Sequence, residues 1–349
     1  MAKLKLDLEK GVLDYIQKYP NSSSSEIHVG FGKLVAFATI KRTIKELIDK
    51  KFVAITGKGK STRYFISKSL DILYPIDIET YFEKEIDNRK IKIGFEFNLI
   101  GETLKEVSLF SDAEMLKLSM LQNIFIENTS KLSKNEYNKE FERLAIDLSW
   151  KSSQIEGNTY SLLETEKLLK EKETAAGKTK DEAVMLLNHK EALDFILNNP
   201  DYLNPLSVSR IEDIHSILVD GLGIDRNIRN RRVGISGTNY KPLDNAFQIK
   251  EALVDMCVLI NERVSVFEKA LLALVLLSYI QPFSDGNKRT ARIISNALLI
   301  DNKYCPISFR TVDSIDYKKA MLIFYEQNNI SAFKTIFIEQ FEFAVNTYF

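Results

Sequence analysis

The sequence has few of the residues that build disulfide frameworks and zinc sites. Its 349 residues include two cysteines, three histidines and one tryptophan. Cys257 and Cys305 lie far apart in the sequence and do not show the spacing of metal ligands, so neither a disulfide framework nor a zinc site is predicted. We therefore expect a protein of the reducing cytoplasm.

Long hydrophobic runs are also missing. Residues 1–10 alternate charged and apolar side chains and lack the continuous apolar stretch of a secretory signal. The apolar run from Ala270 to Ile280 is too short to cross a bilayer as a helix. The sequence thus predicts a protein without a membrane partner.

The chain carries no net charge, but its charges are unevenly distributed. Lys and Arg together number 48, as do Asp and Glu. Residues 1–68 hold 14 of the basic residues and only 6 of the acidic ones, which leaves 34 against 42 in the remainder. The length exceeds one ordinary core, so we expect two or three domains with a basic head on an acidic body.

The basic head has the pattern of a small α+β module. Apolar periodicity predicts helices over 6–18, from about 26, and over 38–50, followed by two strands, 52–56 and 63–67, around a basic glycine-containing turn. This order resembles a winged helix-turn-helix, which implies double-stranded DNA as a partner of residues 1–68. A module for protein contacts or homodimerisation remains the alternative. The candidate DNA contacts are the basic residues of the third helix and of the turn, Lys41, Arg42, Lys45, Lys58, Lys60 and Arg63.

The rest of the chain reads as mainly α. Residues 69–137 are predicted to be a helical connector, and residues 138–349 a larger helical domain. One interruption stands out, because residues 231–240 combine β-branched residues with a turn signal and predict a short hairpin. The predicted helices of the larger domain are 140–154, 162–172, 181–198, 207–219, 248–260, 267–280, 288–299 and 317–328.

The most informative segment is the twelve-residue stretch 281–292, which lies between two of these helices. It reads QPFSDGNKRTAR, and a tight turn followed by a helix start near Lys288 would point unpaired backbone N–H groups into the turn. Arg289 and Arg292 share one face of the new helix and can both reach phosphate oxygens, while Asp285 can hold a divalent cation. Together these features predict a triphosphate site.

This stretch resembles the sequence motif of the Fic family, His-x-Phe-x-Asp/Glu-Gly-Asn-Gly/Lys-Arg-x-x-Arg. The resemblance implies an all-helical Fic fold with a short β-hairpin flap, and transfer of AMP from ATP to a Ser, Thr or Tyr hydroxyl of a target protein, with Mg²⁺. It implies that Asp285 binds the metal and that Phe283 anchors the loop. The implied nucleotide contacts are Gly286, Asn287 and Lys288 on the phosphates, and Arg289 and Arg292 on the β- and γ-phosphates.

Three other segments are similar to parts of this family. The helix around His215 resembles an early helix of the fold, with the histidine in a structural role. Residues 237–242 resemble the flap that holds a target segment by strand addition, and the implied flap residues are Gly237, Thr238, Asn239 and Tyr240. A helix over about 141–158 carries a motif similar to the family's inhibitory Ser/Thr-x-x-x-Glu-Gly/Asn, formed by Ser152, Glu156, Gly157 and Asn158.

In such proteins the inhibitory glutamate pairs with the second arginine of the loop motif, which here is Arg292. A carboxylate–guanidinium pair of this kind removes the arginine from the nucleotide. The resemblance therefore predicts a protein that inhibits itself.

The sequence departs from the family at one catalytic position, since Gln281 stands where the family has histidine. An amide has no useful basicity at neutral pH and cannot accept the proton of the target hydroxyl. Three hypotheses follow. They are a self-inhibited adenylyltransferase impaired at Gln281, a non-catalytic nucleotide-binding regulator that acts on DNA, and a hydrolase that removes AMP from a modified target.

Overall fold

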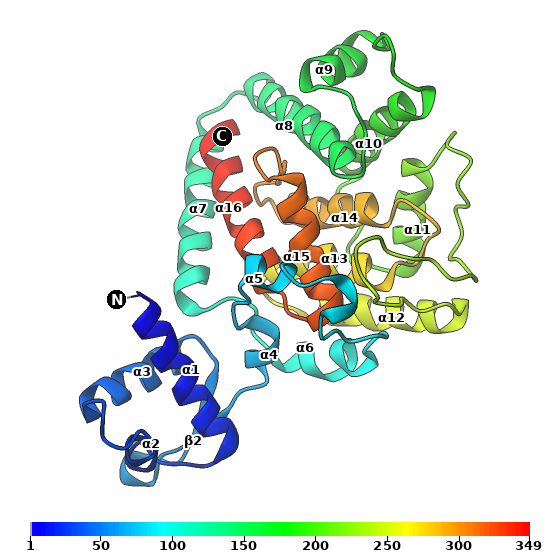
Figure 1. Ribbon diagram of the computed structural model, residues 1–349. Helices are drawn as coiled ribbons and strands as arrows, with labels where there is room; N and C mark the ends of the chain where they lie inside the picture. The colour runs from blue at the N-terminus through cyan, green and yellow to red at the C-terminus, as the bar shows by residue number, and fades with distance from the viewer. Residues whose placement is uncertain (1) are drawn as a thin grey trace. The chain divides into compact units, whose positions relative to one another are not determined.

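The computed structural model describes the backbone of residues 2–349 and the side chains from residue 7 onward. The chain forms two compact units. The first contains the residues up to Pro75 together with residues 106–115, and the second contains residues 76–105 and 116–349 (Figure 1).

The first unit is a helical trio with a two-stranded antiparallel sheet. Its elements are α1 Ala2–Lys18, α2 Ser24–Gly30, α3 Phe37–Asp49, β1 Val53–Thr56, β2 Arg63–Ile66 and α4 Ser69–Leu73. Ser23 caps α2 in a reciprocal pair with Glu26, and Val53 pairs with Ile66 across the sheet. The predicted order of three helices and two strands is confirmed, while DNA binding through a winged helix stays a prediction.

The second unit is almost entirely helical, which confirms the mainly α class. Among the described residues, none of its helices is long and apolar enough to cross a membrane. A last helix, α16, had not been predicted. The unit contains α5 Ile78–Phe82, α7 Asp112–Ser130 beyond its first turn, α8 Lys134–Ile155, α9 Leu162–Glu171, α10 Lys180–Asn198, α11 Val208–Leu218, α12 Ala246–Glu262, α13 Val266–Ile280, α14 Asn287–Asp301, α15 Ser314–Gln327 and α16 Ser331–Tyr348, and the short α6 Leu104–Glu106 lies at the boundary of the two units.

The centre of this unit is α13, an apolar helix with buried side chains on every face. Such a helix can be stable only when other elements surround it. The next helix, α14, packs along it, with α11, α12 and α15 also around the pair (Figure 1). The loop 281–286 that joins α13 to α14 is therefore held at both ends by buried helices.

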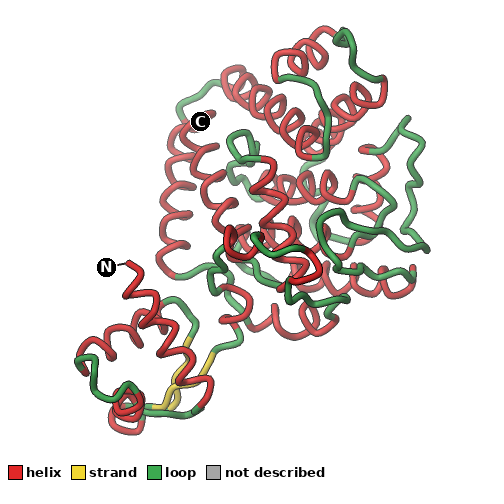
Figure 2. Tube along the Cα trace, viewed as in Figure 1, coloured by secondary structure: helices red, strands yellow, loops and turns green. Residues whose placement is uncertain are grey.

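The predicted hairpin over residues 231–240 is wrong. The strands of the described residues are β1 and β2 alone, and residues 231–240 form turns and extended loop (Figure 2). The backbone N–H of Tyr240 donates to Thr238 Oγ1 within the segment, and the Tyr240 hydroxyl donates to the carbonyl of Tyr279 in α13. Contacts with the core thus replaced the cross-strand ladder that the β-branched residues suggested.

Candidate functional site

The loop between α13 and α14 is shaped by two residues with left-handed backbone. Gln281 ends α13 with φ 53°, and Gly286 precedes α14 with φ 81°. A side chain at position 286 would be strained by this φ and would come within 3.3 Å of Val219 and 3.4 Å of His215. No side chain caps α14, so its first backbone N–H groups remain open to an anion.

The side chain of Asn287 holds the loop together. Its amide nitrogen donates to Gln281 Oε1 at 3.0 Å and to the Phe283 carbonyl at 2.9 Å, and its amide oxygen accepts the Phe283 N–H at 2.8 Å. The residue is buried. Its side chain is committed to the loop, so the backbone N–H is the group left for the predicted phosphate contact.

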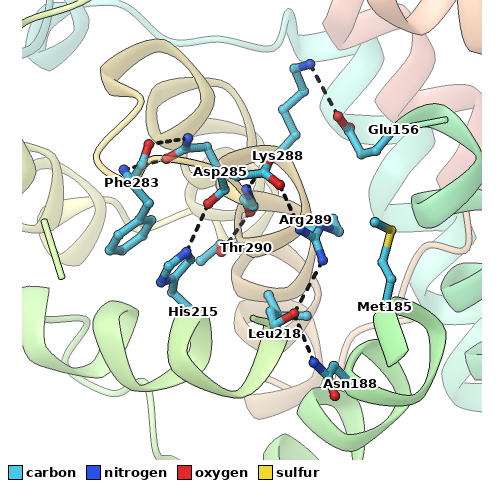
Figure 3. Close-up of polar contacts among 12 residues, drawn as sticks. Glu156, Met185, Asn188, His215, Leu218, Phe283, Asp285, Lys288, Arg289 and Thr290 are labelled. Carbon is cyan, nitrogen blue, oxygen red and sulfur yellow. Dashed lines mark hydrogen bonds and ion pairs between the residues drawn. The ribbon is translucent and has the colours of Figure 1, made fainter. Parts of the chain in front are cut away.

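Behind the loop, Phe283 and His215 form a stacked pair. Their ring centroids are 3.6 Å apart and the ring planes are nearly parallel. His215 Nε2 lies 3.0 Å from the Asp285 carbonyl oxygen (Figure 3). Burial is the main cause that lowers the pKa of His215, so its neutral ring can donate this hydrogen bond at pH 7. The contacts are those of a residue that supports the loop, and they agree with the predicted anchoring role of Phe283.

Two buried arginines extend from α14 beneath the loop. Arg289 lies 3.3 Å from the Leu218 carbonyl and 3.5 Å from Asp285 Oδ2 (Figure 3). Arg292 donates to the hydroxyl and to the carbonyl of Ser152, each at 2.8 Å. Its guanidinium also lies over the Tyr317 ring, 5.3 Å from the centroid. These contacts fix both cations next to the open end of α14.

Glu156, at the end of α8, lies between the cations that a phosphate would need. Its carboxylate accepts from Arg292 at 2.9 Å and lies 3.4 Å from Lys288 Nζ. Burial favours protonation of Glu156, but the charges of Arg292 and Lys288 outweigh it and lower its pKa. The Glu156 carboxylate is therefore ionised at neutral pH, and its negative charge offsets the positive charge of Arg292.

The cavity that remains beside Glu156 is small. It holds about 50 Å³ and is lined by Glu156, Gln281, Asp285, Gly286, Asn287, Lys288 and Arg289. Pockets for small molecules commonly measure about 300–1,000 Å³. With Glu156 in this position, the cavity is well below that range, and its lining includes Arg289 but not Arg292.

Of the predicted inhibitory residues, Ser152 and Glu156 reach Arg292 directly. Asn158 is part of a different contact, since its amide donates to the Glu182 carbonyl and its oxygen accepts the Tyr160 N–H. Gly157 follows the helix with φ 103°, which is a conformation that favours glycine. These two residues turn the chain after α8.

Gln281 is engaged within the protein through both ends of its amide. The nitrogen donates to the Ser278 carbonyl at 2.6 Å, and the oxygen accepts from Asn287. Neither end can take a proton at neutral pH. The nearby Tyr325 hydroxyl is no substitute, because burial raises its pKa far above the ordinary value.

Asp285 is the candidate metal ligand. Its side chain is 67% exposed, with Oδ1 accepting the Gly286 N–H and Oδ2 near Arg289. Among the described residues, no group of three or more His, Cys, Asp or Glu could form a metal cage. One exposed carboxylate suits Mg²⁺, which commonly binds proteins through one or two carboxylates together with substrate phosphates and water.

Arg229 is a site residue that sequence reasoning missed. Its buried guanidinium donates to the Gln281 carbonyl at 2.6 Å and to the Arg231 carbonyl at 2.7 Å. Its backbone N–H donates to the Pro282 carbonyl at 3.0 Å. Arg229 thus fixes the first two residues of the loop. Little in the sequence distinguishes it, since it is one of four arginines within seven residues of a loop.

The four predicted flap residues share no hairpin, but they lie along one loop that contacts the helical core. Gly237 has φ 88°, Asn239 donates to Asp87, and Tyr240 is buried in a stack with Tyr279.

In the first unit, Arg63 is partly exposed. The other predicted DNA contacts, on α3 and in the turn, are exposed: Lys41, Arg42, Lys45, Lys58 and Lys60.

Part of the chain matches a known protein family. Residues 205–299, which include the loop, match the Fic/DOC family. The chain is 28% identical over 180 residues to a protein adenylyltransferase Fic of Nematostella vectensis, covering 48% of this chain and 40% of the relative. It is 28% identical over 166 residues to the Aedes aegypti protein of the same name, covering 44% and 32%. The chain thus spans less than half the length of these relatives.

Solved structures with the same fold include Fic-1 of Caenorhabditis elegans, residues 134–508, with a TM-score of 0.59 at 19% identity over 68% of this chain and 72% of that one. A Fic-domain signalling protein of Bacteroides thetaiotaomicron has a TM-score of 0.57 at 20% identity, over 66% and 94%. At these identities the likeness concerns the fold.

Proposed function

The chain contains a Fic/DOC family domain, and from this premise we propose that it is a Fic-type protein adenylyltransferase, self-inhibited by Glu156 and impaired by Gln281. The observation that carries the proposal is the open N-terminus of α14 beside Arg289 and Arg292, with the Glu156 carboxylate placed against Arg292 at 2.9 Å. A helix N-terminus with adjacent arginines is a phosphate site, and a carboxylate in that position is its competitor.

In the proposed reaction, the oxygen of a target Ser, Thr or Tyr attacks the α-phosphorus of ATP. The bond from that phosphorus to the bridging oxygen of the β-phosphate breaks, pyrophosphate leaves, and the hydroxyl proton must pass to a base. The backbone N–H groups of α14 and the two arginines bind and orient the phosphates. Mg²⁺, held by Asp285, would neutralise phosphate charge.

The proton transfer is the step that this chain performs poorly. Gln281 lies where the base would be, yet its amide cannot accept a proton and is held by Ser278 and Asn287. Loss of a positioned general base typically lowers the rate by about 10²–10⁴-fold. Binding and orientation of the nucleotide need no base, so they should survive the substitution.

The type of transfer can be tested with ATP labelled at either the α- or the γ-phosphate. The Gln281→His, Glu156→Gly double variant is incubated with each nucleotide and Mg²⁺, and protein-bound label is measured. Label from the α-position alone supports AMP transfer. Label from the γ-position would show phosphoryl transfer, which we disfavour because Gly286 occupies a position where phosphotransferases of the related Doc branch usually have alanine.

A second candidate is a non-catalytic nucleotide-binding regulator that acts on DNA. The observation in its favour is the combination of an engaged Gln281 amide with exposed lysines on α3 and in the β1–β2 turn. Duplex binding by the parent chain that weakens steeply with salt, and weakens further in a Lys58→Ala, Lys60→Ala variant, would support it. The hydrolase hypothesis remains third, because removal of AMP normally also uses the missing histidine as proton donor.

A further inference from the structure

A segment of the chain itself, residues 89–97, lies against the flap loop 237–241. Lys241 donates its backbone N–H to the Ile93 carbonyl at 2.8 Å, and Gly94 forms a parallel bridge with Lys241. This is a strand-like pairing at the place where the proposed function puts an incoming target segment. We call residues 89–97 the strap.

The strap is anchored at its first residue by a buried ion pair. Arg89 lies 3.2 Å from Glu326 Oε1, and it donates to the Gly237 carbonyl at 2.8 Å. Both side chains are almost fully buried, and Tyr81 donates a further hydrogen bond to Glu326 at 2.6 Å. Separating such a pair would leave an uncompensated charge in the interior, so this end of the strap is fixed.

The other end of the strap reaches the last turn of α13. The Phe95 ring stacks on Tyr279 with centroids 4.8 Å apart, and the Glu96 N–H donates to the Tyr279 hydroxyl at 2.9 Å. Tyr279 comes two residues before Gln281. The strap therefore passes from the flap to the helix end that carries the catalytic position.

Between these two anchors the strap is held mainly through its backbone, because the Lys92 N–H donates to the Glu326 carbonyl at 2.8 Å and the Lys90 carbonyl accepts from the Gln327 side chain. Ile93 is 62% exposed, and Lys92 and Gly94 on either side of it are also exposed. An exposed segment that is held mostly by backbone hydrogen bonds can be exchanged for another extended segment, because that segment offers the same backbone groups.

The composition of the strap has one further property. Residues 82–102 contain no Ser, Thr or Tyr. A segment placed at the docking edge of a hydroxyl-modifying enzyme would become its own substrate if it carried a hydroxyl there. This one cannot be modified.

From these observations we propose that the strap is an inert intramolecular occupant of the flap, and that a target binds by replacing residues 92–97 with an extended segment that bears a hydroxyl residue near the position of Gly94. The inference rests on the proposed function for the nature of the target. The occupancy of the flap can be tested separately, by peptide binding.

The binding test uses a fluorescent peptide with the sequence of residues 86–98 and the full-length protein. Phe95→Ala loosens the strap by removing the stack on Tyr279, and Phe247→Ala, at a 78% exposed aromatic on α12, is the matched control. We expect Phe95→Ala to bind the peptide at least tenfold more tightly than the parent and the control. Equal binding by all three proteins, with unchanged thermal melts, would overturn the proposal.

The placement test adds a hydroxyl to the strap. Gly94 has open space where a Cβ would lie and no positive φ, so Gly94→Ser should fold normally. In the Gln281→His, Glu156→Gly background with ATP and Mg²⁺, we expect mass spectrometry to find AMP on Ser at position 94 but not on Ser in a control Leu163→Ser variant, at a 77% exposed position.

The two tests separate the failure of the strap from the failure of the proposed function. If the background labels other proteins but never position 94, the strap does not lie where a target lies. If no form transfers AMP but Phe95→Ala still gains peptide affinity, the strap stands as the occupant of the flap and the proposed function fails.

Discussion

Replacing Glu156 by glycine should open the nucleotide site. In the parent, a terminal phosphate must displace the Glu156 carboxylate from Arg292, at 2.9 Å, and from Lys288, at 3.4 Å. A hydrogen bond to a charged group contributes about 1.5–3 kcal/mol net. Because Glu156 is 21% exposed, its contacts are partly screened, and we take about 2 kcal/mol as the cost of displacing it.

A difference of about 2 kcal/mol corresponds to an approximately 30-fold change in Kd. We therefore expect Glu156→Gly to bind ATP about 30-fold more tightly than the parent when Kd is measured by calorimetry with Mg²⁺. Glu156→Gln should lie between the two, since it loses the charge but keeps an acceptor. Glu166→Gln is the matched control, because Glu166 pairs with Lys170 on an exposed face of α9. An unchanged Kd in both Glu156 variants would refute the inhibitory role.

Three other predictions concern Glu156, Arg229 and His189. Because Arg292 and Lys288 lower the pKa of Glu156 from its ordinary 4.5, the carboxylate stays ionised above that pH, and the ratio of parent to Glu156→Gln Kd should be constant from pH 8 to 5.5; a ratio that collapses at pH 5.5 would contradict this. Arg229→Ala should lower the free energy of unfolding in urea by about 3 kcal/mol, because it removes a buried cation that donates to two carbonyls, and the 88% exposed Arg232→Ala should not. Burial, with the nearby arginine charges, puts the pKa of His189 well below 6.5, so the unfolded chain takes up a proton that the folded chain does not. The parent should therefore lose about 1.4 kcal/mol more stability than His189→Leu between pH 7.5 and 5.5, and equal losses would refute the assignment.

The apolar patterning of the sequence was sufficient to predict most helices of both units, but not α16. It was also sufficient to predict the tight turn and the helix that starts after it, since Gly286 carries a local physical reason for its position, while the binding of an anion there stays a prediction. The pairing of Glu156 with Arg292 came from resemblance alone. No local pattern could have brought together residues 136 positions apart.

The failures of prediction have a common cause. Residues 231–240 have the local composition of a hairpin, but the buried Tyr240 and the pairing of Lys241 with Ile93 draw this segment onto the core. Arg229 and the Arg89–Glu326 pair were missed for the same reason, because their partners lie 52 and 237 residues away. Such contacts depend on the tertiary fold and leave no periodic signal.

The central claim is that the chain is an adenylyltransferase that lacks only its base, and a comparison of rates tests it most directly. The initial rate of AMP incorporation from α-labelled ATP is measured for Glu156→Gly and for Glu156→Gly with Gln281→His, at saturating nucleotide. We predict a rate about 10²–10⁴-fold higher with the histidine present. Equal rates would contradict the account: if measurable, they would show that another group accepts the proton, and if absent in both forms, that the chain transfers no AMP.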